Sequence, residues 1–341
     1  MKKTIIFAVI LAVLCLNVAA VVAAESPRFP VPDTVSPELQ RLIAADPPPF
    51  WSEQPESAAE WKAFVNNFVE AVTPTLPALR EQMGVTMESG HIGGVSVFIL
   101  SPKVLPAGKT DKVLLNFHGG GYVLGPGESG TPEAILMAGI GGYRVIMPDY
   151  RMVPDYPYPA AMDDAIAVYK ELLKTTPTNK IGVFGTSTGG GMTLALVLRA
   201  KAEGLPLPAA IAAGTPWTDL TKTGDSYFTN AHVDNVLVSY DGWLGAAAKA
   251  YAAGRDLKEP MLSPVYGDVS GFPPTLLTTG TRDLFLSNTT RMHLKLRQAG
   301  VDADLLVFEG MSHAQYHMDP AAPETIFHFL ELEKFFKRHL K

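Results

Sequence analysis

A serine flanked by glycines is the first residue of this chain that could carry chemistry. The stretch GTSTG occupies residues 185–189, with Ser187 at its centre. The apolar run at 181–184 predicts a buried strand, and residues 190–198 predict a helix. A strand that turns sharply into a helix at G-x-S-x-G exposes the serine at the tip of the turn, and the glycines permit the strained, closely packed backbone. Ser187 is therefore the predicted nucleophile.

Two further residues could complete a hydrolytic triad, because each follows a predicted strand. Asp283 comes after the apolar run at 275–279, and His313 comes after the run at 305–308. Active residues of open α/β sheets gather at the carboxyl ends of the strands. His313 is the predicted general base, and Asp283 would orient and stabilise its imidazole. The order Ser187, Asp283, His313 is the one that this kind of fold uses.

Three consecutive glycines supply a candidate oxyanion hole. Gly119, Gly120 and Gly121 follow His118, and an H-G-G-G element ahead of G-x-S-x-G forms this hole in lipases and esterases. The backbone N–H groups of the glycines, with that of Thr188, are the predicted donors to a developing oxyanion. A plain turn is the alternative interpretation, which the spacing and order of the motifs disfavour.

Other acidic residues and histidines compete for these roles. Asp219 also follows a predicted strand and is the alternative acid, with a turn-forming role as its other interpretation. His317 follows no strand and lies deeper in its loop than His313. His118 is expected to organise its own loop. His328 and His339 are predicted to be surface or partly buried structural residues of the last helix. Asp163 and Asp164 are predicted to be capping or solvated residues.

Composition narrows the class of protein. The chain has 341 residues, 47% apolar and 18% charged residues, and a formal charge of −6. These values describe a globular protein and argue against nucleic acid as a partner. The only cysteine is Cys15. No disulfide, thiol nucleophile or thiolate metal site is therefore expected in the mature chain. The predicted chemistry needs no cofactor and no metal.

Residues 1–24 have the layout of a secretory signal peptide. A basic start at Lys2 and Lys3 precedes an apolar run and then small residues up to Ala24. Cleavage is predicted near Ala24, and a site at Ala20 also fits. A retained membrane anchor is the alternative, although the apolar run is short for a spanning helix. We expect an exported protein, periplasmic or extracellular, without stable membrane insertion after cleavage.

The remaining sequence predicts alternating strands and helices. A capping box at 57–60 opens a helix that 73–77 should end. Such alternation predicts an α/β fold with a mostly parallel central sheet covered by helices on both faces. Residues 221–260 interrupt the alternation and predict a helical insertion. Strands are predicted at 95–100, 113–117, 143–147, 181–184, 209–213, 275–279 and 305–308.

Together these motifs resemble the bacterial hormone-sensitive-lipase-like branch of the α/β-hydrolases. The matching stretches lie between about residues 95 and 320 and include HGGG, DYR at 149–151, GTSTG, TPWTD at 215–219 and GMSH at 310–313. The resemblance implies an α/β-hydrolase domain at 86–341 and an N-terminal helical cap at 25–85. It also implies that Gly120 and Gly121 make most of the oxyanion contacts, and that homodimers are possible. Candidates for lining an acyl pocket, or for packing between cap and core, are Trp51, Trp61, Tyr227, Phe228 and Trp243.

The chain departs from many relatives at three positions. Many members have Asp before the nucleophile and Ala after it, where this chain has Thr186 and Thr188. The branched side chain of Thr188 is expected to narrow the pocket. Ser287 stands where an acidic residue usually follows the catalytic Asp. These differences leave the predicted triad intact.

With the export predicted from residues 1–24, the hypothesis is a secreted carboxylic-ester hydrolase, and the resemblance implies that it acts on short- to medium-chain acyl esters. A prolyl-oligopeptidase-like peptidase shares the core and the serine turn, but no propeller repeat precedes the predicted catalytic domain and HGGG favours esters. A non-catalytic ligand receptor of the same fold is a third interpretation. Receptors that resemble this family have lost the histidine, whereas His313 is present here.

Overall fold

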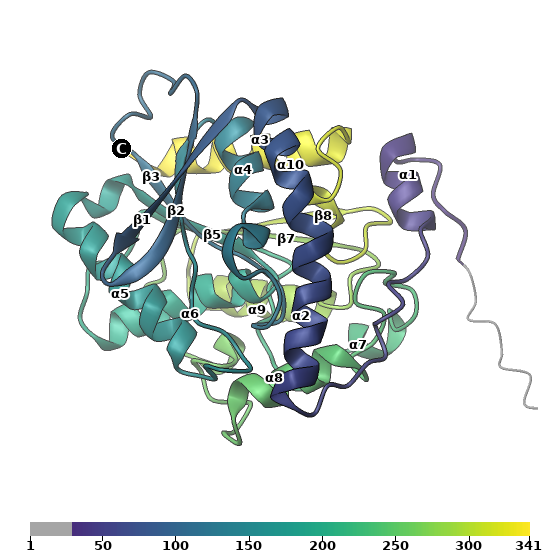
Figure 1. Cartoon of the computed structure of the whole chain (residues 1–341). Helices are drawn as coiled ribbons and strands as arrows, with labels where there is room; N and C mark the ends of the chain where they lie inside the picture. Colours follow the sequence, from purple (N-terminus) through teal and green to yellow (C-terminus); the bar gives the residue numbers. More distant parts are fainter. Residues whose placement is uncertain (1–28) are drawn as a thin grey trace, which may run out of the picture. The chain divides into compact units, whose positions relative to one another are not determined.

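An eight-stranded sheet is the centre of the fold (Figure 1), in a computed structural model that describes residues 29–341. The strand order is β1-β2-β4-β3-β5-β6-β7-β8. Strand β2 is antiparallel to both β1 and β4, and the remaining pairs are parallel. The strands are β1 Val85–Ile92, β2 Val95–Pro102, β3 Val113–Phe117, β4 Arg144–Pro148, β5 Ile181–Thr186, β6 Ala210–Gly214, β7 Thr275–Gly280 and β8 Ala303–Phe308.

Helices cover both faces of the sheet. One apolar cluster joins the sheet to α5, α6 and α9, and a second joins it to α3, α4 and α10. The helices are α1 Pro37–Ala44, α2 Ala58–Val72, α3 Leu76–Met83, α4 Pro132–Gly139, α5 Ala160–Thr175, α6 Thr188–Ala202, α7 Ser226–Thr229, α8 Trp243–Ala252, α9 Leu286–Gln298 and α10 Pro323–His339. Short 3-10 turns are η1 Thr73–Thr75, η2 Gly127–Gly130, η3 Thr178–Lys180, η4 Pro264–Tyr266 and η5 Gln315–His317. The predicted fold class is confirmed.

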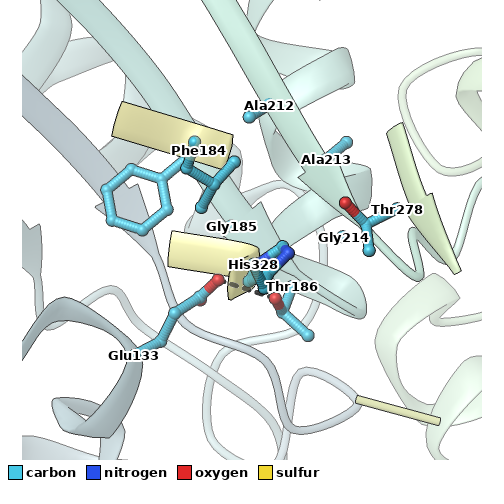
Figure 2. A pocket seen from close by; sticks show the side chains of 10 residues that line it. Glu133, Phe184, Gly185, Thr186, Ala212, Ala213, Gly214, Thr278 and His328 are labelled. Carbon is cyan, nitrogen blue, oxygen red and sulfur yellow. Dashed lines mark hydrogen bonds between the residues drawn. The ribbon is translucent and has the colours of Figure 1, made fainter. Parts of the chain in front are cut away.

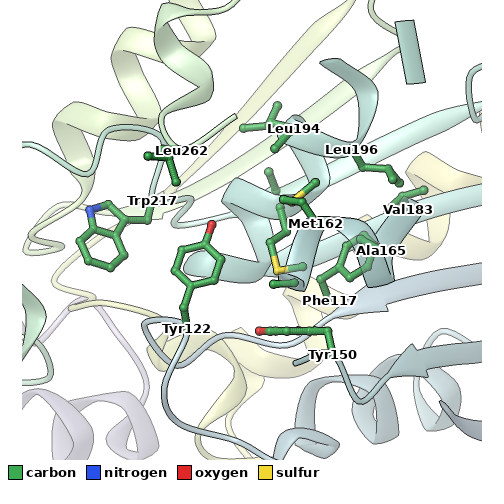
Figure 3. Packing of buried hydrophobic residues seen from close by; sticks show 14 of the residues in the cluster. Phe117, Tyr122, Tyr150, Met162, Ala165, Val183, Leu194, Leu196, Trp217 and Leu262 are labelled. Atoms are coloured by element: carbon green, nitrogen blue, oxygen red, sulfur yellow. The ribbon is translucent and has the colours of Figure 1, made fainter. Parts of the chain in front are cut away.

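The central strands are buried on both faces, as the helices on both sides require. Every residue of β3, β5, β6 and β7 is buried. Figure 3 shows Phe117 and Val183 of the sheet beside Met162 and Leu194 of the helices. Continuous apolar strands of this kind are typical of parallel sheets. This rigid core fixes the carboxyl ends of the strands, where the predicted site residues lie.

All seven predicted strands are present, and an eighth strand, β1, was not predicted. Strand β1 forms a hairpin with β2 at the edge of the sheet. Its sequence, VTMESGHI, has too few apolar residues to show a sustained alternation, and only its first residue is buried. The capping box of α2 is formed as predicted by Ser57 and Glu60. After α2 ends, the chain continues into α3, which was not predicted.

The prediction of a helical insertion at 221–260 was only partly right. The segment contains the single-turn α7 and the ten-residue α8, and the remainder is irregular. Polar side chains in this segment form hydrogen bonds with nearby backbone groups, and these bonds compete with the backbone hydrogen bonds of a helix. Asp234, for example, accepts from the N–H groups of Val236 and Leu237. Within residues 29–341, no helix is long and apolar enough to cross a membrane. The predicted signal peptide at 1–24 lies outside the described residues.

Candidate active site

Ser187 sits at a strained turn between β5 and α6. Its backbone has φ 62° and ψ −122°, a left-handed conformation that non-glycine residues rarely adopt. The end of β6 holds this turn in place: the N–H of Ser187 donates to the carbonyl of Gly214 at 2.8 Å. The N–H of Trp217 donates to the carbonyl of Ser187 at 2.9 Å. Strain held by surrounding structure is characteristic of a nucleophile elbow.

The flanking glycines are required because the elbow packs against the end of β3. A Cβ atom on Gly189 would lie 1.8 Å from the carbonyl oxygen of Phe117, and one on Gly185 would lie 2.3 Å from it. Phe117 is followed directly by the HGGG loop. A Cβ atom on Gly119 would lie 3.2 Å from the Cβ of Ser187. The same close packing therefore brings the glycine loop next to the serine.

His313 and Asp283 form a buried pair. Nδ1 of His313 lies 3.0 Å from Oδ1 of Asp283. The backbone N–H of Phe285 also donates to Oδ1, at 2.8 Å, and the hydroxyl of Thr279 donates to Oδ2 at 2.7 Å. These donors fix the carboxylate, which in turn fixes the imidazole with its proton on Nδ1. Nε2 of His313 is thus left as the basic nitrogen.

Nε2 of His313 is buried and has no hydrogen-bond partner in the part of the chain that the structure describes. The acid–base pair is therefore assembled, and the hydrogen bond from Ser187 to His313 is not formed. Catalytic hydrogen bonds are often long in ligand-free enzymes and tighten when substrate binds. Ser187 follows β5, Asp283 follows β7 and His313 follows β8, so all three come from the same edge of the sheet.

The glycine loop adopts a conformation that needs glycine. Gly120 has φ 120° and Gly121 has φ 68°. His118 organises this loop as expected, because its Nδ1 lies 2.7 Å from the carbonyl oxygen of Gly119. Tyr150 stacks on the His118 ring and donates to the His118 carbonyl at 2.7 Å. The N–H groups of Gly120 and Gly121 make no hydrogen bond among residues 29–341, so they are available to a ligand.

Trp243 covers the glycine loop. A Cβ atom on Gly121 would lie 2.6 Å from its ring. The backbone N–H of Trp243 donates to the carbonyl of Trp51, and the indole ring of Trp243 packs on Phe64 of α2. Of the five aromatic pocket candidates, Trp243 is therefore the one whose ring contacts the predicted oxyanion loop. Trp61 packs against Phe64, Tyr227 bonds to Trp217 and Asn288, and Phe228 is exposed.

Thr186 lines a small buried pocket together with Glu133 and His328 (Figure 2). Its hydroxyl donates to Oε1 of Glu133 at 2.6 Å and lies 2.8 Å from the hydroxyl of Tyr316. Asn116 donates to the other oxygen of Glu133. Burial raises the pKa of Glu133 to about 7. An aspartate at position 186 would bring a second carboxylate against Glu133, which explains why threonine suits this chain.

The raised pKa of Glu133 predicts a pH-dependent stability. Because the folded-state pKa lies above the unfolded one, its stabilising effect is complete below pH 4.5 and is lost as the pH rises through 7. Glu133→Gln is expected to remove this loss. Relative to wild type, the free energy of unfolding of the variant should rise by about 3 kcal/mol between acidic and alkaline pH. Urea unfolding of both proteins from pH 4 to 8.5 measures this change, and a difference in unfolding free energy that stays constant with pH would contradict the prediction.

The rival residues have other partners. Asp219 is buried and pairs with Arg291 at 2.7 Å, and it makes no contact with His313. The prediction of a capping or solvated Asp164 was wrong, because Asp164 is largely buried and binds Arg151 through two guanidinium nitrogens. The prediction of a surface or partly buried His328 was also wrong, because its side chain is fully buried against Tyr316, and burial lowers its pKa to about 3. Burial likewise lowers the pKa of His317 to about 4. Neither is poised as a base near neutral pH.

Two sets of contacts near the site were not predicted from the sequence. Asp234, from the insertion, is completely buried and bonds to the backbone on both sides of the acid–base pair. Ser287 exchanges hydrogen bonds with Ser226, each hydroxyl accepting from the other residue's N–H at 2.9 Å. No local motif marks Asp234, since its role depends on partners far away in the sequence.

Among residues 29–341, no group of three acidic, histidine or cysteine residues is placed to hold a metal ion.

Comparison with known proteins agrees with this geometry. A family model described as the α/β-hydrolase fold matches residues 114–317. The chain belongs to the α/β-hydrolase family. The matched region begins in β3, which leads into the glycine loop, and it ends after His313.

Relatives and solved structures narrow the type of α/β-hydrolase. An acetyl-hydrolase of Streptomyces hygroscopicus is 32% identical over 65% of this chain and 74% of its own length. A putative acetyl-hydrolase, LipR, of Mycobacterium tuberculosis is 31% identical over 72% of this chain and 80% of its own length. The crystal structure of an esterase, E25, has a TM-score of 0.89 at 44% identity and covers 92% of this chain and 97% of its own. The crystal structure of an esterase from the bacterial hormone-sensitive-lipase family has a TM-score of 0.74 at 28% identity. It covers 90% of this chain and 99% of its own. This α/β-hydrolase is thus hormone-sensitive-lipase-like and of the carboxylesterase and lipase type.

Proposed function

We propose that this α/β-hydrolase cleaves short- to medium-chain acyl esters through Ser187, His313 and Asp283. The observation that carries the proposal is the buried His313–Asp283 pair, whose Nε2 is left without a partner, at the same sheet edge as the strained Ser187. Related proteins named as esterases and acetyl-hydrolases support carboxylic-ester hydrolysis as the reaction. The triad and the acyl length are our assignment.

In the proposed reaction, Ser187 attacks the ester carbonyl while Nε2 of His313 takes its proton. Asp283 holds the imidazole and stabilises the imidazolium that forms. His313 then gives the proton to the departing alcohol, leaving an acyl group on Ser187. Water then loses a proton to His313 as it attacks the acyl carbonyl. His313 returns this proton to Oγ of Ser187 as the acyl–oxygen bond breaks, which releases the acid and restores the serine.

The oxyanion is assigned to the N–H groups of the glycine loop and of Thr188. Gly120 and Gly121 have free N–H groups, and Gly119 lies against Ser187. Thr188 is the first residue of α6, where backbone N–H groups have no partner within the helix. The positive end of the helix dipole adds to this stabilisation. Each well-placed donor lowers the barrier by roughly 3 kcal/mol.

Export and self-association are further parts of the proposal. Export rests on the basic, apolar and small-residue layout of residues 1–24. Association into a homodimer is supported by exposed apolar side chains on α10, namely Ile326, Phe327 and Leu330, together with Val307 on the edge strand β8. An apolar patch beside an open sheet edge is a common dimer contact.

A substrate panel tests the proposed function. The purified protein is expected to hydrolyse p-nitrophenyl acetate and butyrate well, the hexadecanoate ester poorly, and a prolyl p-nitroanilide not at all. A fluorophosphonate probe should label Ser187, as peptide mapping by mass spectrometry would show. Hydrolysis of the prolyl amide in preference to the butyrate would favour a peptidase. Absence of both hydrolysis and labelling would favour a ligand receptor.

A further inference from the structure

Residues 230–235 of the insertion form a bridge across the two loops that carry the acid and the base. Nδ2 of Asn230 donates to the backbone carbonyl of Asp283 at 2.8 Å. The N–H of Asn235 donates to the hydroxyl of Ser312, beside His313, at 3.3 Å. We call residues 230–235 the triad bridge. It is anchored in turn to the N-terminal segment, because Nδ2 of Asn235 donates to the carbonyl of Leu42 at 2.8 Å.

Asp234 is the charged centre of the triad bridge. Its Oδ2 accepts from the N–H of Leu284 at 2.7 Å and from the N–H of His313 at 3.3 Å. Leu284 directly follows Asp283, so one carboxylate oxygen joins the backbone of the acid loop to that of the base. Oδ1 accepts from the backbone N–H groups of Val236 at 2.8 Å and of Leu237 at 3.1 Å. The same carboxylate therefore also fixes the backbone that directly follows the triad bridge.

The hydrogen-bond pattern favours an ionised Asp234. Both of its oxygens accept from backbone N–H groups, and a charged carboxylate accepts such bonds more strongly than a neutral carboxylic acid. Burial and the negative charge of Asp283 raise its pKa to about 6, while His313 acts in the opposite direction. Asp283 and His313 are the two ionisable groups among the largest influences on the pKa of Asp234. At pH 8 the carboxylate is therefore charged and lies in the same buried region as the imidazole.

We propose that Asp234 is a positioning residue for the triad, which fixes the His313 and Asp283 loops relative to each other and adds a second negative charge that stabilises the His313 imidazolium. This inference rests on the proposed function. The physical reason is that a misplacement of about 1 Å between reacting groups can cost roughly 10²-fold in rate. A negative charge nearby also favours the protonated imidazole. Asp234 touches neither substrate nor the reacting atoms in this scheme.

Asp234→Asn tests the proposal, because the amide keeps the size but must turn its NH₂ toward N–H donors. We expect kcat for p-nitrophenyl butyrate to fall about 10- to 100-fold, with KM changed less than about threefold. The acidic limb of the plot of kcat/KM against pH should move to lower pH, because the negative charge that favours the protonated imidazole is lost. If this variant does not fold, Asp234→Ser, which is smaller and keeps an acceptor, carries the same expectations.

Asp219→Asn is the matched control. Asp219 is equally buried and lies near the start of the insertion, but its partners are Arg291, Tyr266 and Thr221. This control should lower the melting temperature and leave the acidic limb where it is, with kcat within about threefold of wild type. Equal effects of both substitutions on kcat, with no movement of the limb for Asp234→Asn, would reduce Asp234 to a structural residue and overturn the proposal.

Failure of this inference and failure of the proposed function give different results. Wild type and Ser187→Ala are measured in the same assay. If wild type does not hydrolyse the ester, or Ser187→Ala retains its activity, the proposed function is wrong. If both behave as expected while Asp234→Asn has the wild-type kcat and acidic limb, only the role of Asp234 is overturned.

Discussion

Ser187→Ala is expected to lower kcat for p-nitrophenyl butyrate by about 10⁶-fold, because no acyl-enzyme can form without the nucleophile. The residual rate would come from the glycine loop and substrate binding, which the substitution leaves in place. The fold should survive, since Ser187 holds its neighbours through its backbone N–H and carbonyl groups. Steady-state kinetics and circular dichroism on the same sample measure both outcomes.

The combination with His313→Ala sharpens this prediction. Nucleophile and base act as a unit, so the double variant should be about as slow as either single variant. Multiplication of the two losses would show that Ser187 and His313 act independently, which contradicts the proposed mechanism. Undiminished labelling of Ser187→Ala by the fluorophosphonate probe would place the nucleophile elsewhere.

Asp283→Ala is expected to lower kcat by about 10⁴-fold, because His313 would lose both its orientation and its counter-charge. The structure predicts a smaller loss for Asp283→Asn. Oδ1 accepts from His313 and from the N–H of Phe285, so the amide oxygen should take this position and its NH₂ should turn to the Thr279 hydroxyl. That hydroxyl can accept as readily as it donates. The correct imidazole tautomer is then kept and only the charge is lost.

Comparing the two Asp283 variants separates orientation from charge. We expect Asp283→Asn to be faster than Asp283→Ala by roughly one or two orders of magnitude, with KM little changed for either. Kinetics on matched preparations would measure the ratio. Equal activities would show that the Phe285 and Thr279 contacts do not select the orientation of the amide.

The contacts around Asp283 also show why the serine elbow alone could not define this site. The stretch GTSTG predicts a strained turn, because glycine is needed wherever backbone packs this closely. The structure identifies the surface against which it packs, the carbonyl of Phe117 at the end of β3. That contact makes the glycine loop and the nucleophile neighbours, although they are about 70 residues apart in the chain.

Local pattern succeeded where neighbours in the sequence decide the structure. Short apolar runs predicted seven strands, since a strand buried on both faces has to be apolar throughout. Because the sheet is parallel, the residues after β5, β7 and β8 had to meet at one edge. The same reasoning missed β1, which is an edge strand whose pairing with β2 depends on backbone hydrogen bonds and not on side-chain burial.

The sequence by itself determined the fold class and the three residues proposed as the triad, because each follows from composition and order along the chain. Only the tertiary structure decided what surrounds them. Asp234 becomes part of the site through N–H groups 50 and 79 residues away, and Glu133 supports the elbow through Thr186, 53 residues away. A buried carboxylate is recognisable only from the partners that compensate its desolvation, and those partners are brought together by folding.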